Sequence, residues 1–157
     1  MNELSSRLQL DLKEAMRSAD TTRRDVLRFL RSDIHNVEIE RGHTLSNDEI
    51  EEVVVRQIKQ RRDSIEQFAR GGRQDLVATE TAQILVLEDY LPPQLTPVEV
   101  LALAREMVVV SGASGLGDMQ RIIEALRERV GPRAAGNVVA QAVRTALIER
   151  RDGANAS

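Results

Sequence analysis

Apolar residues recur at intervals of three or four positions along almost the whole chain, beginning with Leu4, Leu8 and Leu12. This spacing places them on one face of an α-helix, and no stretch shows the period of two that is typical of a half-buried strand. The fold class is therefore expected to be all-α. Seven helices are predicted, over residues 3–18, 22–41, 47–70, 74–90, 97–112, 119–130 and 137–150.

Local sequence features set several helix ends and one domain boundary. Ser46 with Glu49, and Thr96 with Glu99, each match a capping box at the start of a helix. Pro92-Pro93 excludes a continuous helix and restricts the preceding residue to extended conformations. The predicted organisation is an N-terminal four-helix domain (1–92), a small C-terminal three-helix domain (93–151) and a disordered polar tail (152–157).

Composition narrows the class of protein. The chain has 157 residues, no cysteine and a net charge of −3, so disulfides, zinc–cysteine sites and thiol nucleophiles are excluded. A reducing, cytoplasmic setting is expected. The apolar runs are far shorter than the ~20 residues that span a bilayer, so neither a signal peptide nor a membrane partner is expected. Only 2% of the residues are aromatic, which leaves little material for stacking on nucleic-acid bases.

Searches for catalytic chemistry give negative results. The glycine-rich stretch 112–118 has Asp118 where a phosphate-binding loop needs lysine, so a turn with Ser114 or a neighbour capping the next helix is expected. His35 and His43 are not at metal-ligand spacing. Adjacent carboxylates such as Glu51-Glu52 point about 100° apart on a helix and do not converge. We expect no catalytic residue, cofactor or metal.

A row of basic side chains follows the second predicted helix. With Val26 at 0° and 100° per residue, Arg24, Arg28, Arg31 and His35 fall at about 140–200°, nearly opposite the apolar face. The planar guanidinium group of arginine can donate two parallel hydrogen bonds to phosphate oxygens. Two interpretations stay open: a solvated face in an arginine-rich protein, or a binding surface for a polyanion such as RNA.

Arg61 is expected to have a different role, because it falls inside the apolar stripe of the third predicted helix. A half-buried guanidinium needs a partner, and Glu80, Asp33 or a helix end could supply it. Arg62 lies at the edge of the same stripe. A structural role is predicted for this arginine pair, with contact to a ligand as the alternative.

The fifth predicted helix is apolar on nearly every side, through Val98, Leu101, Leu103, Val108 and Val110. A three-helix domain of under ~60 residues has little room to hide apolar residues on all faces of one helix. The helix is therefore either central to the small domain or a contact surface for another protein.

Several ordered segments carry a family resemblance over about Leu8–Leu147. These segments are Leu27-Arg28-Phe29-Leu30, Asn36-Val37-Glu38-Ile39-Glu40, residues 60–68, residues 71–76, residues 90–95, Gly112-Ala113-Ser114 with Gly117-Asp118-Met119, and residues 133–139. In these segments the chain resembles the GatB/YqeY family, specifically the stand-alone YqeY-like proteins.

The resemblance implies a domain similar to the tail of the B subunit of the glutamine-dependent aminoacyl-tRNA amidotransferase, a tail that contacts transfer RNA. The resemblance also implies a description as a carbon–nitrogen ligase with glutamine as amido donor, but no residue of this chain matches a catalytic residue of that enzyme. The function expected is a non-catalytic accessory in translation that binds tRNA or another structured RNA. The alternative is an adaptor that binds an amidotransferase or another translation protein.

Overall fold

The computed structural model describes residues 2–155, and these residues form helices without any strand, so the all-α prediction is confirmed. Their contacts divide the chain into two compact units, Met1–Leu91 and Pro92–Ser157. The α-helices are α1 (Glu3–Arg17), α2 (Thr21–Arg41), α3 (Asn47–Arg70), α4 (Gln74–Glu88), α5 (Pro97–Ser111), α6 (Met119–Val130) and α7 (Gly136–Asn155), and the 3-10 helices are η1 (Leu116–Asp118) and η2 (Gly131–Arg133).

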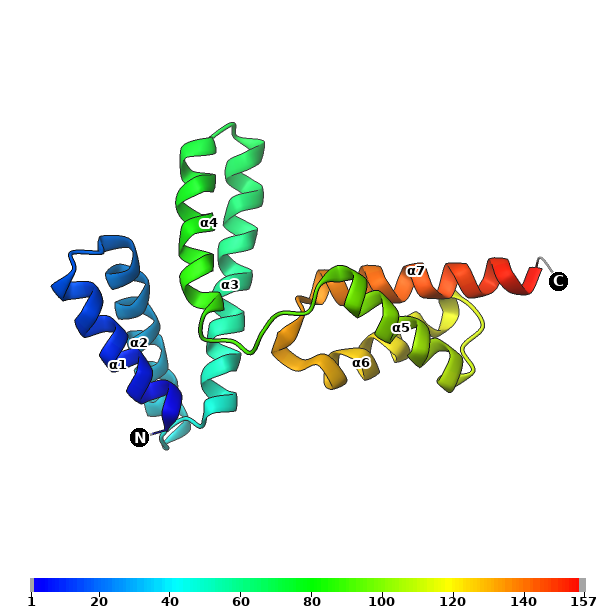
Figure 1. Cartoon of the computed structure of the whole chain (residues 1–157), viewed down its shortest axis with the longest axis horizontal. Helices are drawn as coiled ribbons and strands as arrows, with labels where there is room; N and C mark the ends of the chain where they lie inside the picture. The colour runs from blue at the N-terminus through cyan, green and yellow to red at the C-terminus, as the bar shows by residue number, and fades with distance from the viewer. Residues whose placement is uncertain (1, 156–157) are drawn as a thin grey trace. The chain divides into compact units, whose positions relative to one another are not determined.

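In the first unit, α1 lies along α2 and α3 lies along α4 (Figure 1). The faces that become buried are those that carry the three-to-four spacing in the sequence, because packing removes apolar surface from water. The buried side chains at the centre are Leu8, Leu12, Val26, Leu27, Leu30, Ile50, Val54, Ile58 and Leu87.

The far end of the α3–α4 hairpin is packed differently from this core. Between Ile58 and Ile84 no side chain is fully buried, and Ile65 and Phe68 are only half-buried. Two helices by themselves cannot enclose a core, because each shields only one face of the other. Polar pairing therefore has a larger share in holding this part of the hairpin together.

The second unit packs α5, α6 and α7 around one aliphatic core. Gly112 ends α5 with φ of +72°, a left-handed conformation that favours glycine. The buried side chains are Val100, Ala104, Val108, Ile122, Leu126, Val139, Val143 and Leu147.

Three local predictions were wrong. The tail predicted to be disordered from residue 152 is helical as far as Asn155, because no proline stops α7 and each added residue gains a backbone hydrogen bond; residues 156–157 lie outside the described part. Helix α4 ends at Glu88 rather than at Tyr90, where the backbone turns and the Tyr90 amide donates to Leu87. The box at Thr96 is half-formed, since Glu99 accepts from the Thr96 hydroxyl and not from its amide.

The glycine-rich stretch 112–118 is a turn, as predicted, but Ser114 does not cap α6. Its amide donates instead to Asp118 Oδ2 at 3.1 Å. That bond, together with Arg121, lowers the pKa of Asp118. Within residues 2–155 no single helix is long and apolar enough to cross a membrane, although α5 and the η1–α6 segment, bent by 99° at their break, reach the required length and composition as a pair.

Candidate functional site

The basic row lies on α2, and its position is fixed by the two ends and the buried face of this helix. Asp20 caps the first turn by accepting from the Arg23 amide at 3.1 Å, and Gly42 ends the helix with φ of +77°. Val26 and Leu30 are buried. The opposite side of α2 is thereby turned toward solvent, and it carries Arg28, Arg31 and His35.

Members of the row differ in their partners. Arg24 is half-buried and its Nε lies 3.0 Å from Asp25 Oδ1, so its charge is partly neutralised. Among the residues that the structure describes, no carboxylate pairs with Arg28 or Arg31. Most other arginines of the same unit form ion pairs, which makes these two the least compensated guanidinium groups on α2.

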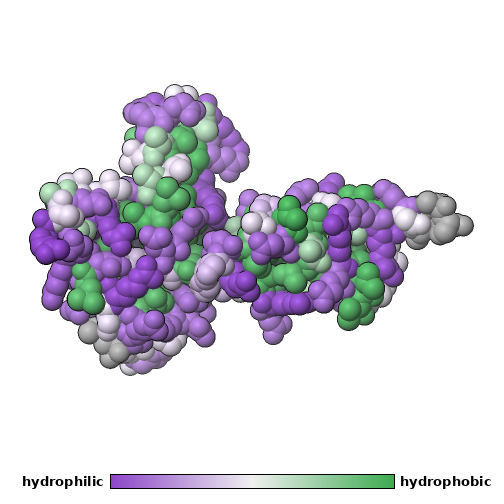
Figure 2. Space-filling view, viewed as in Figure 1, coloured by the Kyte–Doolittle hydropathy of each residue, from purple (hydrophilic) through white to green (hydrophobic). Residues whose placement is uncertain are grey.

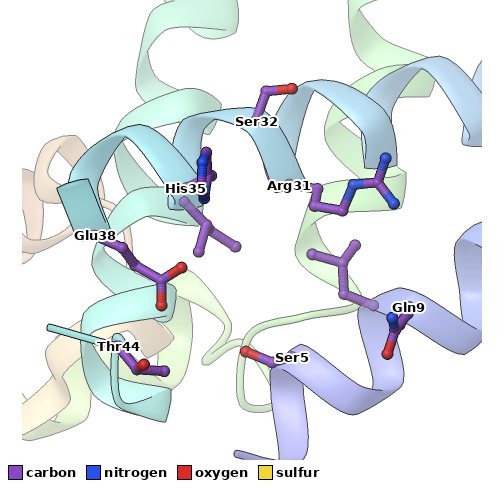
Figure 3. Close-up of a pocket in the computed structure, with 9 residues that line it drawn as sticks. Ser5, Gln9, Arg31, Ser32, His35, Glu38 and Thr44 are labelled. Atoms are coloured by element: carbon purple, nitrogen blue, oxygen red, sulfur yellow. The ribbon is translucent and has the colours of Figure 1, made fainter. Parts of the chain in front are cut away.

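A groove between α1 and α2 opens beside this row and has a volume of about 500 Å³. Figure 3 shows its labelled side chains arranged around the opening, with Ser5 and Gln9 on α1 facing residues of α2. Buried Leu8 and Ile34 form its apolar floor. The groove-lining residues of α2 are Arg31, Ser32, Ile34, His35 and Glu38, and Thr44 joins them from the turn that follows.

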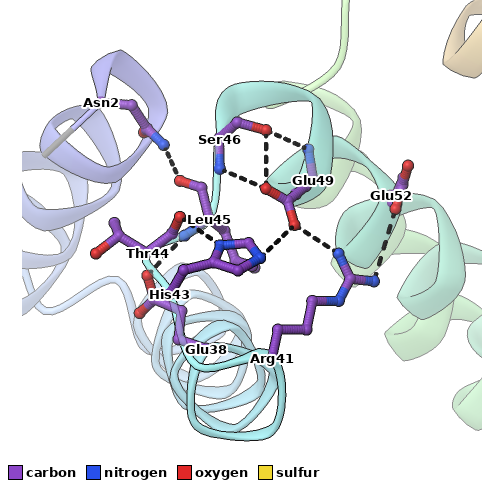
Figure 4. Close-up of polar contacts among 9 residues, drawn as sticks. All are labelled: Asn2, Glu38, Arg41, His43, Thr44, Leu45, Ser46, Glu49 and Glu52. Atoms are coloured by element: carbon purple, nitrogen blue, oxygen red, sulfur yellow. Dashed lines mark hydrogen bonds and ion pairs between the residues drawn. The ribbon is translucent and has the colours of Figure 1, made fainter.

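The α2–α3 turn, which contributes Thr44 to the groove, is held in place by a network of polar contacts (Figure 4). Glu38 Oε2 accepts from the Leu45 amide at 2.9 Å, and the Asn2 side chain donates to the Leu45 carbonyl. Glu49 completes a capping box with Ser46, as the sequence predicted. The Ser46 amide and Arg41 lower the pKa of Glu49.

Arg61 and Arg62 lie on α3 and do not line the groove. Arg61 Nη1 lies 3.2 Å from Glu80 Oε2, one of the partners suggested by the sequence, and it also donates to Gln83. The Arg61 side chain is 16% exposed and that of Glu80 is 21% exposed, so this ion pair is largely shielded from water. Arg62 reaches Glu88 at 3.4 Å with both side chains more exposed.

A second polar cluster was missed by sequence reasoning. The Tyr90 hydroxyl donates to Asp11 Oδ2, and Asp11 also lies 3.3 Å from Arg23 and 3.5 Å from Arg7. Arg7 stands over the Tyr90 ring, 4.5 Å from its centroid. Burial and the bond to Asp11 raise the pKa of Tyr90. The sequence feature that could have indicated this cluster is the single tyrosine at the end of an apolar helix, because a buried phenol needs a polar partner.

Hydrophobic residues interrupt the polar surface of the second unit (Figure 2). On α5, Val98, Val109 and Val110 are 77%, 62% and 82% exposed, while Val100 and Val108 are buried. The helix is therefore part of the core of its unit and also exposes apolar side chains. Next to Val110 a second groove of about 350 Å³ lies between α5 and α6.

Among residues 2–155, no three His, Asp or Glu side chains lie close enough together to hold a metal ion. His35 and His43 occupy the groove wall and the α2–α3 turn respectively. The first unit offers a ligand two exposed cations, Arg28 and Arg31, of which Arg31 lines the groove. Guanidinium groups of this kind suit the binding of an anion.

The fold and this surface define a helical protein with a cationic helix face next to a groove, and comparison with known proteins identifies its family. The family model described as "Yqey-like protein" matches residues 5–147. The chain therefore belongs to the YqeY-like family.

Curated relatives come from fungi and carry the name "Altered inheritance of mitochondria protein 41, mitochondrial". The one from Lachancea thermotolerans is 39% identical over 85 residues, which is 54% of this chain and 46% of the relative. Those from Kluyveromyces lactis and Pyrenophora tritici-repentis are 38% and 35% identical, over 53% and 57% of this chain and 45% and 49% of their own lengths. The matches thus span about half the length of these relatives.

These names contradict the cytoplasmic setting expected from composition, because the relatives are mitochondrial proteins. The expectation rested on the lack of cysteine. That lack excludes disulfides, but it does not distinguish between the compartments in which a protein without disulfides works.

Proposed function

We propose that this protein binds structured RNA, with tRNA as the first candidate, through Arg28 and Arg31 of α2, and that it acts as a non-catalytic accessory in translation. The observation that carries the proposal is a pair of exposed guanidinium groups, one helical turn apart, that have no carboxylate partner among the described residues. Such groups bind phosphate oxygens in a bidentate manner. Arg24 and His35 extend the row toward the two ends of α2.

The net charge of −3 does not oppose this proposal, because binding responds to the local potential more than to the total charge. The scarcity of aromatic residues favours recognition of RNA shape and backbone over stacking on bases. The sequence resemblance to the tRNA-contacting tail of the amidotransferase B subunit adds support. In this proposal the four-helix domain, residues 1–92, carries the RNA contact.

Fluorescence anisotropy of labelled tRNA at ~50 and ~200 mM salt tests the proposal, since phosphate contacts weaken steeply as salt rises. Replacing both Arg28 and Arg31 by Glu is expected to weaken binding more than tenfold, by about 1.4 kcal/mol or more, and to reduce the salt slope by about two. A matched variant with Lys59→Glu and Arg70→Glu on α3 changes the net charge equally and is expected to bind nearly as well as the native protein. Equal binding by all three proteins, or by none, would contradict the proposal.

A second candidate function rests on α5. Val98, Val109 and Val110 are exposed on α5, and Val110 also lines the groove between α5 and α6. Exposed apolar surface of this type marks protein contacts. In this alternative the three-helix domain, residues 93–151, binds an amidotransferase subunit or another translation protein. Size-exclusion chromatography with the purified amidotransferase tests it: a shared peak that is lost with Val110→Asp supports the alternative, and separate peaks oppose it.

A further inference from the structure

Resting on the RNA binding proposed above, we propose that the groove between α1 and α2 holds a single unpaired nucleotide of that RNA. The phosphate of this nucleotide lies on Arg31, its base lies against Leu8 and Ile34, and the edge of the base faces Glu38. The groove volume of about 500 Å³ lies within the range of ~300–1,000 Å³ that is usual for small-molecule sites.

The chemistry of the groove requires a ligand with two different ends. Arg31 offers a cation that pairs with no carboxylate in the part of the chain that the structure describes, and Glu38 contributes a carboxylate to the same groove. These residues are seven positions apart on α2, so they share one face about 10 Å apart along the axis. A ligand that is anionic throughout is repelled by Glu38, and one that is cationic throughout is repelled by Arg31.

Two apolar side chains also line the groove, and this separates a nucleotide from a simple anion. Leu8 and Ile34 keep only 4% and 6% of their surface exposed, and Ser5 and Gln9 lie on the α1 side (Figure 3). Part of a base can contact the exposed edge of these two side chains. Of the two carboxylate oxygens of Glu38, Oε2 accepts from the Leu45 amide, and Oε1 is left to accept from an amino group of the ligand.

Recognition by Glu38 distinguishes cytosine from uracil. A carboxylate accepts from the N4 amino group of cytosine, whereas uracil has a carbonyl oxygen at the corresponding position. We expect a preference for an unpaired cytidine over an unpaired uridine of about tenfold, in line with one well-placed base contact.

The experiment uses the full chain and three RNA hairpins that are identical in the stem: one blunt, one with a single-stranded cytidine extension and one with a uridine extension. The native protein is expected to bind the cytidine hairpin about tenfold more tightly than the blunt one. Ser5→Leu, which narrows the groove, removes this gain and leaves blunt-hairpin binding intact, while Ser6→Leu, one position along α1, keeps it. In Glu38→Gln the amide oxygen can still accept from the Leu45 amide, which leaves the amide NH2 facing the ligand; the preference for cytidine is then lost and uridine, whose O4 accepts, binds more tightly.

The other outcomes separate this inference from the proposed function. Equal binding of the extended and blunt hairpins by the native protein overturns the nucleotide site and leaves phosphate binding by Arg28 and Arg31 standing. Binding of free cytidine monophosphate without any gain from the extension assigns the groove to a free nucleotide and also overturns the inference. Failure to bind any of the three hairpins overturns the RNA-binding function itself, and the inference with it.

Discussion

The hydroxyl of Tyr90 donates a hydrogen bond to the carboxylate of Asp11, 79 positions earlier in the chain. The bond joins the turn after α4 to α1 and therefore closes the first unit. Arg7 and Arg23 flank the same carboxylate at 3.5 and 3.3 Å. The first and last helices of the unit are thus linked by a polar cluster beside the aliphatic core.

Tyr90→Phe is expected to lower the free energy of unfolding by about 1–2 kcal/mol, because it removes this hydrogen bond and keeps the buried ring under Arg7. Chemical denaturation of the full chain measures the change. An unaltered denaturation midpoint would show that the contact contributes nothing to stability.

The raised pKa of Tyr90 also predicts loss of stability in alkali. The folded protein keeps the phenol protonated above the ordinary tyrosine pKa of 10.0, while the unfolded chain releases the proton there, so the stabilisation is present below about pH 10 and falls as the pH rises further. Because the chain has one tyrosine and no tryptophan, near-ultraviolet absorbance follows Tyr90 alone. Tyrosinate should appear together with the loss of helical circular dichroism; its appearance in a fully helical protein would contradict the prediction.

Arg61→Ala is expected to destabilise the α3–α4 hairpin by about 2–3 kcal/mol, since it leaves the shielded carboxylate of Glu80 without its cation. The matched change Arg62→Ala, in which the partner Glu88 is 3.4 Å away and more exposed, is expected to cost less than about 1 kcal/mol. Thermal melting compares the two variants. A normal melting curve for Arg61→Ala combined with weaker RNA binding would favour the ligand-contact role instead.

Glu49→Gln is expected to lower stability at neutral pH and to have little effect in acid. The Ser46 amide and Arg41 lower the pKa of Glu49, so its contribution to stability is present above the ordinary glutamate pKa of 4.5 and is lost as the pH falls through the lowered value. Denaturation at pH ~7 and pH ~3 reports the difference. Glu52→Gln is the control, because Glu52 lies 3.8 Å from the same arginine and is mostly exposed. A similar loss at both pH values would oppose this account.

Ala104→Leu is expected to destabilise the second unit by about 1–3 kcal/mol, because Ala104 is fully buried in its core and extra methylenes overpack it. Ala102→Leu, two positions away and exposed, serves as the control and should leave the melting temperature within about 2 °C. Equal melting of both variants would mean that the core of this unit accepts added volume.

The sequence by itself determined the helices, most of their ends and the side of α2 that carries cations. It also indicated the need of Arg61 for a partner, because helical periodicity and capping depend on residues within a few positions of one another. The prediction of disorder at residues 152–155 was wrong, because it relied on polar composition and neglected the tendency of an existing helix to continue.

Only the tertiary structure decided which arginines are compensated and which are free to bind. Within residues 2–155, no carboxylate lies within ion-pair distance of Arg28 or Arg31, whereas Arg61 has a partner because α4 brings Glu80 alongside α3. The groove beside Arg31 and the bond from Tyr90 to Asp11 arise in the same way. Each depends on the distance and rotation between helices far apart in sequence, which packing of the whole unit sets and no local pattern records.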